Sequence, residues 1–171
     1  MLVIAATERE LAHVRRFETH VCGIGPVEAA ISVARALAQR KPDAVLHVGI
    51  AGARTIEPLS VVLGSESIYC DIEARIPVID RVAPDQELLA RLRDALPDAH
   101  VVPIGTSAAV GGATTCEVEA MEGFGVLRAC STAGVPAVEL RVVSNRFDET
   151  EWRFDEAFEA LGAALDRLDV V

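Results

Sequence analysis

The sequence predicts an α/β fold of three layers, α/β/α, with helices on both faces of a central, mostly parallel or mixed sheet. Apolar runs that read as strands alternate with amphipathic stretches over most of the chain. One of these runs is continuously apolar, which is typical of a strand covered on both faces. With 171 residues and 51% apolar content, we expect one compact domain over residues 1–171.

An apolar run at residues 2–7 precedes "EREL", a pattern that predicts a strand followed by a helix. Thr7 is the expected N-cap of that helix, with Glu10 three residues further on, as in a capping box. Glu10 should therefore stand in the first turn of a helix, just past the C-terminal end of a strand.

The next two predicted strands each end in a glycine-rich segment. "THVCGIG" (19–25) precedes an expected helix over 26–41, where Pro26 suits the first helical position. "DAVLHVGIAGA" (43–53) is the continuously apolar run, so we expect it at the centre of the sheet.

The second half of the chain continues the alternation. Its expected strands lie within 59–73, 100–112 and 139–145, and its expected helices within 84–97, 121–136 and 149–168. Ligands bind such sheets where the strands end. A site therefore requires the strand-end features to converge at one edge of the sheet: Glu10, 23–25, 49–53, 105–112 and 144–145.

Composition narrows the class of partner. A net charge of −10 argues against a nucleic-acid or anionic-membrane surface, and a small-molecule ligand is expected instead. No apolar run is long enough to cross a bilayer, and a cytoplasmic location is expected. The four cysteines lie far apart in the sequence without metal-ligand spacing, so we expect reduced thiols, no metal and no cofactor: Cys22, Cys70, Cys116 and Cys130.

Several motifs have a structural interpretation when taken singly. "VCGIGPVEAA" has the order of a dinucleotide turn but lacks the third glycine, which favours a plain turn or one serving another ligand. The acids Glu117, Glu119 and Glu122 suit a solvated helix start. Asn145 suits an Asx turn, and His47, within an apolar strand, suits a core histidine with satisfied hydrogen bonds.

Considered together, the motifs favour a functional interpretation over these structural ones. "TEREL", "GIGPVEAA", "HVGIAGA" and "VEAMEGFGVLRACSTAGVPAVELRVVSN", in this order and followed by a tryptophan, resemble the purine nucleoside phosphorylase and methylthioadenosine/S-adenosylhomocysteine nucleosidase superfamily. The likeness is greatest to its futalosine hydrolases, nucleosidases of menaquinone biosynthesis. It covers most of the chain and implies a nucleoside phosphorylase-like fold, a purine nucleoside substrate and a homo-oligomer.

The chemistry of such an enzyme needs residues of these types. Cleaving a ribosyl C–N bond passes through an oxocarbenium-like sugar, so water, ribose hydroxyls and the leaving base must all be held. The resemblance implies that Glu10 activates the water, that Glu122 and Met121 meet the ribose, and that Asn145 contacts the base. Gly25 and Ile50 complete the expected substrate-binding residues.

Two positions bear on the alternatives within the superfamily. Ile50 stands where related enzymes often carry a hydroxyl, which favours water over phosphate, although Arg15, Arg16 and Arg54 are candidate phosphate ligands. Asn145 suits a 6-oxopurine such as hypoxanthine, because its amide NH2 donates to a carbonyl. The alternatives are a methylthioadenosine/S-adenosylhomocysteine nucleosidase, a nucleoside phosphorylase and, from another class, a non-catalytic nucleoside-binding protein.

Overall fold

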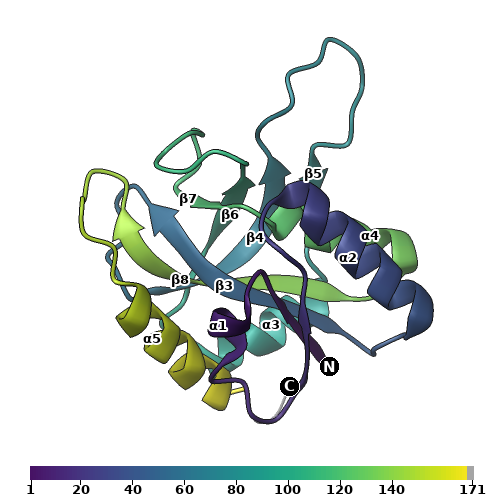
Figure 1. Cartoon of the computed structure of the whole chain (residues 1–171), viewed down its shortest axis with the longest axis horizontal. Coiled ribbons are helices and arrows are strands. Elements are labelled where there is room, and N and C mark those ends of the chain that lie inside the picture. Colours follow the sequence, from purple (N-terminus) through teal and green to yellow (C-terminus); the bar gives the residue numbers. More distant parts are fainter. Residues whose placement is uncertain (169–171) are drawn as a thin grey trace.

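A computed structural model describes residues 1–168, in which an eight-stranded mixed sheet is flanked by five helices (Figure 1). The elements in chain order are β1 (Leu2–Ala5), α1 (Glu8–Leu11), β2 (Glu18–Val21), α2 (Pro26–Gln39), β3 (Val45–Ala53), β4 (Val61–Tyr69), β5 (Arg81–Val82), α3 (Gln86–Ala95), β6 (His100–Thr106), β7 (Val118–Ala120), α4 (Gly123–Ala133), β8 (Ala137–Arg146) and α5 (Phe154–Asp166). The predicted alternation of strands and helices is confirmed, and the short strands β5 and β7 are additions to it.

The sheet curls back on itself around β8. Its strands run in the order β2-β1-β3-β7-β6-β4-β5, and β8 pairs in parallel with β3 and antiparallel with β4. Strands β3, β8, β4, β6 and β7 therefore form a closed ring. Apolar side chains from all five of these strands pack together, namely Ala51, Ala53, Val62, Ile104, Val118, Ala120 and Val143. The third predicted strand is central, as expected, because β3 pairs with β1, β7 and β8.

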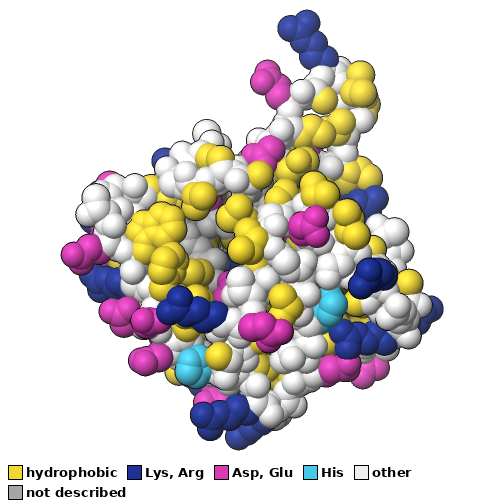
Figure 2. Space-filling model, viewed as in Figure 1, with side chains coloured by type: hydrophobic (Ala, Val, Ile, Leu, Met, Phe, Trp, Pro, Cys, Tyr) yellow, Lys and Arg dark blue, Asp and Glu magenta, His cyan; other side chains and the backbone are white. Residues whose placement is uncertain are grey.

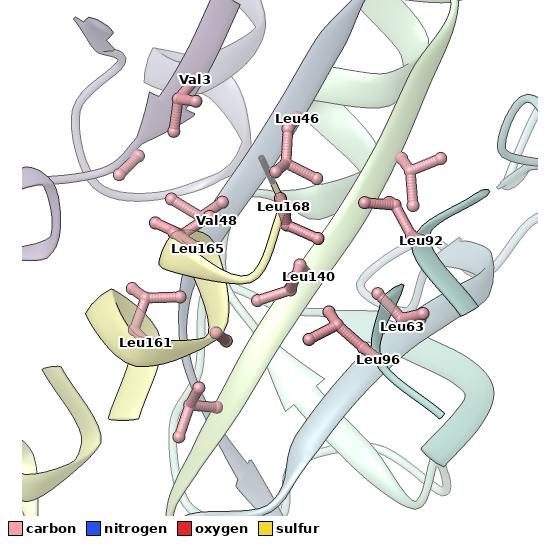
Figure 3. Packing of buried hydrophobic residues seen from close by; sticks show 14 of the residues in the cluster. Val3, Leu46, Val48, Leu63, Leu92, Leu96, Leu140, Leu161, Leu165 and Leu168 are labelled. Atoms are coloured by element: carbon pink, nitrogen blue, oxygen red, sulfur yellow. The ribbon is translucent and has the colours of Figure 1, made fainter. Parts of the chain in front are cut away.

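Helices α3 and α5 cover one face of the sheet. Figure 3 shows Leu161, Leu165 and Leu168 of the C-terminal segment facing Val48 of β3 and Leu140 of β8. All five side chains are almost fully buried, and burying a leucine stabilises the fold by about 1.5–3 kcal/mol. This packing fixes the two long central strands, whose C-terminal ends carry site residues.

Helices α2 and α4 cover the other face and touch each other closely. A Cβ at Gly125 would lie 2.3 Å from the carbonyl oxygen of Pro26, so the small residue permits the contact. Helix α4 ends at Gly134 in the left-handed conformation, with φ 65°, as its C-terminal signal predicted. The expected three layers are thus present.

Two segments depart from the predicted boundaries. Helix α5 begins at Phe154, later than the start of the expected range of 149–168, so Trp152 precedes the helix and is 45% exposed. The loop between β4 and β5 projects away from the rest of the chain (Figure 1). Among residues 1–168, no helix has the length and apolar character needed to cross a membrane.

Candidate active site

A cavity of about 450 Å³ opens at the end of the sheet where β1, β3 and β8 finish. Figure 2 shows a hollow on this face, rimmed largely by hydrophobic side chains. Its lining comes from α1, the turn after β2, the end of β3, the loop at 109–111, the junction of β7 and α4, the end of β8, and α5. The five strand-end features that the sequence analysis singled out all contribute to this lining.

Glu10 lies in the cavity wall and is held from two sides. Its Oε2 accepts hydrogen bonds from the Thr7 backbone N–H (2.9 Å) and hydroxyl (2.8 Å), which completes the predicted capping box. Its Oε1 accepts a hydrogen bond from the backbone N–H of Ile50 at 3.3 Å. One carboxylate therefore both caps helix α1 and faces the cavity.

Met121 and Glu122 lie at the junction of β7 and α4, and both line the cavity. The Glu122 Oε1 accepts a hydrogen bond from the backbone N–H of Gly25 (3.0 Å), and its Oε2 lies 3.7 Å from Nη2 of Arg141. Burial raises the pKa of Glu122, while the Arg141 charge and the Gly25 N–H act in the opposite direction. Gly25 is not among the residues that line the cavity, but its N–H binds the carboxylate of Glu122, which does line it.

The interpretation of the acidic cluster as a solvated helix start is wrong for two of its members. Glu122 is 5% exposed and Glu119 is 7% exposed. Glu119 accepts hydrogen bonds from the backbone N–H groups of residues 112–114, and Glu117 accepts them from Thr55 and Ile56. Glu119 thereby orders the loop at 112–114 beside the cavity, because a buried carboxylate requires donors.

Asn145 lies near the end of β8, next to a shift in the β3–β8 register that places it opposite Gly52. Its side chain is 6% exposed and lines the cavity. Oδ1 accepts a hydrogen bond from the Ser144 hydroxyl (2.9 Å), and Nδ2 donates to the Arg146 carbonyl (3.1 Å). The Phe147 ring packs against bare Gly52, whose added Cβ would lie 2.6 Å from Cε1. Nδ2 keeps a second hydrogen for a ligand.

Arg141 is the residue of this region that the sequence analysis missed. Its guanidinium is fully buried beneath the cavity, and Nε donates to Glu139 at 2.8 Å. Nη1 has no hydrogen-bond partner among the described residues. A Cβ at Gly49 would lie 2.2 Å from Nη1 and 2.5 Å from Oε1 of Glu10, so these two atoms share the space that a side chain at Gly49 would fill. The charged pair in "ELR", inside an apolar strand, was the available signal.

His47 is fully buried, as the core-histidine interpretation predicted. Nδ1 lies 3.0 Å from the carbonyl oxygen of Ile4 and must donate to it, which leaves Nε2 to accept from Nη2 of Arg141. Burial, followed by the charge of Arg141, lowers the pKa of His47. The imidazole is therefore neutral.

The arginines considered as phosphate ligands lie elsewhere. Arg54 donates to the carbonyls of Thr114 and Cys116 and lies over the Phe147 ring, whereas Arg15 borders a separate groove beside His13. None of Arg15, Arg16 and Arg54 is among the residues that line the cavity. Arg9 does line it, but its guanidinium pairs with Asp155 and lies over the Phe158 ring.

The cysteines are free thiols, but two of them are close in space. The Sγ atoms of Cys70 and Cys116 lie 4.0 Å apart, a proximity that their separation in the sequence concealed. Within residues 1–168, no cluster of three or more His, Cys, Asp or Glu side chains is arranged to hold a metal ion.

Residues 19–169 match the family model described as the Phosphorylase superfamily. This chain belongs to the phosphorylase superfamily. Among superfamily members, it is 32% identical to the futalosine hydrolase of Streptomyces coelicolor, over 85% of this chain and 75% of the relative. It is 31% identical to the futalosine hydrolase of Acidothermus cellulolyticus, over 89% of this chain and 78% of the relative. A 5'-methylthioadenosine/S-adenosylhomocysteine nucleosidase of Actinobacillus succinogenes is 26% identical, over 78% and 70%.

Solved structures show the same superfamily fold. The chain resembles a futalosine hydrolase mutant of Helicobacter pylori with a TM-score of 0.86 and 15% identity, over 98% of this chain and 96% of that one. It also resembles a methylthioadenosine/S-adenosylhomocysteine nucleosidase of Colwellia psychrerythraea that was solved in complex with adenine. The TM-score is 0.83 and the identity 19%, over 98% of this chain and 91% of that one. The nucleoside phosphorylase-like architecture predicted from the sequence is confirmed.

Proposed function

We propose that this protein is a nucleosidase that hydrolyses the N-ribosidic bond of futalosine, releasing hypoxanthine and dehypoxanthine futalosine in menaquinone biosynthesis. The observation that carries the proposal is the meeting of Glu10, Glu122 and Asn145, from three separate elements, around one cavity. Similarity to futalosine hydrolases at about 30% identity supports the choice of substrate.

In this mechanism one carboxylate acts on the attacking water and the other binds the ribose. Glu10 accepts a proton from the attacking water, and Glu122 accepts hydrogen bonds from the ribose hydroxyls beside Met121. Nη1 of Arg141, unpartnered and turned toward Glu10, is a donor for the oxygen atoms that gather there. As the C–N bond lengthens, the oxocarbenium character of the ribose is stabilised by the negative charge of the nearby carboxylates.

The base end of the cavity is assigned to Asn145. Its Nδ2 retains one hydrogen that can be donated to N7 or O6 of hypoxanthine, where negative charge develops as the base leaves. Phe147, packed against Gly52 in the same wall, offers an aromatic surface to the purine.

Water is the proposed nucleophile because the cavity is poor in anion-binding groups. Ile50 presents an aliphatic side chain to the cavity, and its backbone N–H already donates to Glu10. The single arginine in the lining, Arg9, is paired with Asp155. A phosphorolytic site would need several free donors at one point.

Hydrolysis of methylthioadenosine or S-adenosylhomocysteine is the second candidate, because a nucleosidase with that name is 26% identical over 78% of the chain. Asn145 argues for a 6-oxopurine over adenine, since its remaining N–H donates to a carbonyl, while its Oδ1 already accepts from the Ser144 hydroxyl. A non-catalytic nucleoside-binding protein is the third candidate.

One assay separates these candidates. The protein is incubated with futalosine, inosine and methylthioadenosine, each with and without phosphate, and the free base is quantified by chromatography. Phosphate-independent release of hypoxanthine from futalosine supports the proposal. Release of adenine alone supports the second candidate, and nucleoside binding without release supports the third. Release that requires phosphate excludes the hydrolase.

We also propose that the chain forms a homo-oligomer. The exposed large apolar side chains include those of the turn and helix after β2 and of the projecting β4–β5 loop: Ile24, Val27, Ile31, Ile76, Val78 and Ile79. Exposed apolar surface of this kind marks association interfaces. Sedimentation velocity across a concentration series tests the proposal, and a mass that stays monomeric contradicts it.

A further inference from the structure

The Arg141 guanidinium faces three carboxylates, and the one it binds best lies outside the cavity. Nε lies 2.8 Å from Glu139, and Nη2 lies 3.7 Å from Glu122. Oε1 of Glu10 and Nη1 both lie in the space that a side chain at Gly49 would fill. Glu10 and Glu122 line the cavity, whereas Glu139 does not. The shortest ion pair of this arginine therefore involves a carboxylate that is out of reach of a ligand.

The Glu139 carboxylate lies against the start of α4, and its Oε2 has no hydrogen-bond partner among the described residues. A Cβ at Gly123, the first residue of α4, would lie 2.2 Å from Oε2 of Glu139 and 2.4 Å from Oε1. The carboxylate thus sits against the start of an 11-residue helix, where negative charge is favoured, and glycine makes the approach possible. On the other side of Arg141, Nε2 of neutral His47 accepts from Nη2.

We propose that Glu139 is a positioning residue of this active site, which holds Arg141 by Nε and thereby keeps the guanidinium from pairing tightly with Glu122 and Glu10. The inference rests on the proposed nucleosidase function. An arginine pairs with a carboxylate through two parallel hydrogen bonds wherever geometry permits. If Arg141 is released from Glu139, its nearest carboxylate is Glu122. An ion pair between Arg141 and Glu122 would occupy the Glu122 oxygens that are proposed to accept hydrogen bonds from the ribose hydroxyls.

If Glu139 positions Arg141, the pKa of Glu122 depends on Glu139, and this pKa can be measured directly. The groups that act on its carboxyl are Glu10 on α1, Cys22 after β2, Glu139 and Arg141 on β8, and the Gly25 N–H. His47 on β3 contacts Arg141 and not Glu122. Burial raises the pKa of Glu122, and the charge of Glu139 also raises it, while Arg141 lowers it. Neutralising Glu139 removes a repulsion and frees Arg141 to approach, and both changes lower the pKa of Glu122.

The first experiment is Glu139→Gln, studied by kinetics with futalosine and by ¹³C NMR titration of the Glu122 carboxyl without substrate. We expect kcat/KM to fall about 100-fold, the cost of misplacing a group of the site. We also expect a raised KM and a Glu122 midpoint at lower pH. Simple loss of folded enzyme would lower kcat and leave both KM and the midpoint unchanged. Leu140→Val is the matched control, because Leu140 lies on the same strand but packs in the core beneath α3 and α5. This variant should have the wild-type KM and the wild-type Glu122 midpoint.

Glu139→Asp is the second variant and decides the question if the glutamine variant does not fold. It keeps the negative charge but withdraws it by one methylene, so KM should rise and the Glu122 midpoint should fall by less than in Glu139→Gln. Wild-type KM in a folded Glu139→Asp, or an unmoved midpoint in a folded Glu139→Gln, overturns the proposal. If the wild type fails to cleave futalosine, the proposed function falls. A lowered midpoint in Glu139→Gln would still support the positioning of Arg141.

Discussion

The carboxylate of Glu122 accepts a hydrogen bond from the backbone N–H of Gly25 at 3.0 Å, although 97 residues separate the two in the sequence. This bond joins the turn after β2 to the start of α4, two segments that both contribute to the cavity wall. Gly25 has φ 94° and ψ 158°, a conformation that residues with a side chain rarely adopt. The glycine therefore presents its N–H to Glu122 at no steric cost.

Gly25→Ala should weaken ribose binding. The substitution strains the turn by about 1–3 kcal/mol and turns the N–H away from Glu122. We expect a raised KM for futalosine and a lower midpoint of urea unfolding. Gly23→Ala is the matched control, because Gly23 also has a positive φ of 84° but makes no bond to Glu122. An equal rise of KM in both variants would mean that strain alone, and not the loss of the Glu122 bond, causes the effect.

Glu10→Gln should abolish turnover and leave nucleoside binding. The amide cannot take a proton from water, and a positioned general base contributes about 10²–10⁴-fold to the rate. Release of hypoxanthine measures turnover, and calorimetric titration with futalosine measures binding. Glu8→Gln, an exposed acid in the same helix, should retain wild-type activity. A fully active Glu10→Gln would exclude Glu10 as the base.

Asn145→Asp should shift the preference from hypoxanthine nucleosides toward adenine nucleosides. A carboxylate cannot donate to O6 of hypoxanthine but accepts from the 6-amino group of adenine. We expect the ratio of kcat/KM for futalosine to that for methylthioadenosine to fall by at least about 10-fold, the effect of one hydrogen bond of about 1.4 kcal/mol. A ratio that does not change would remove Asn145 from base recognition.

Stability should fall as the pH drops below the ordinary histidine pKa of 6.5. Burial, followed by the charge of Arg141, lowers the pKa of His47, so the unfolded chain binds a proton at mildly acidic pH that the folded chain does not. The free energy of unfolding should then decrease by up to about 1.4 kcal/mol per pH unit from this residue, until the pH reaches its folded pKa. Urea unfolding between pH 7.5 and 5 measures the slope.

His47→Gln should flatten that slope, because it removes the titrating group. His100→Gln, an exposed histidine on β6, is the matched control and should leave the slope as it is. Equal slopes in the wild type and His47→Gln would show that other groups control acid stability.

Local sequence patterns predicted the main helices and strands and missed two strands. Periodicity and caps are encoded within a few residues, as in the Thr7–Glu10 capping box and the glycine that ends α4. Strands β5 and β7 contain two and three residues, which is too short for a period of two to show. Their pairing depends on partners far away in the chain.

The sequence by itself determined that Glu10 and Asn145 stand at strand ends and that Glu122 stands at the start of a helix. Only the tertiary structure decided what surrounds them. The bond from Gly25 to Glu122 and the burial of Arg141 between Glu139 and His47 arise from contacts across the sheet. The physical reason is that a buried charge must find its partners in three dimensions, and spacing along the chain does not record which strands become neighbours.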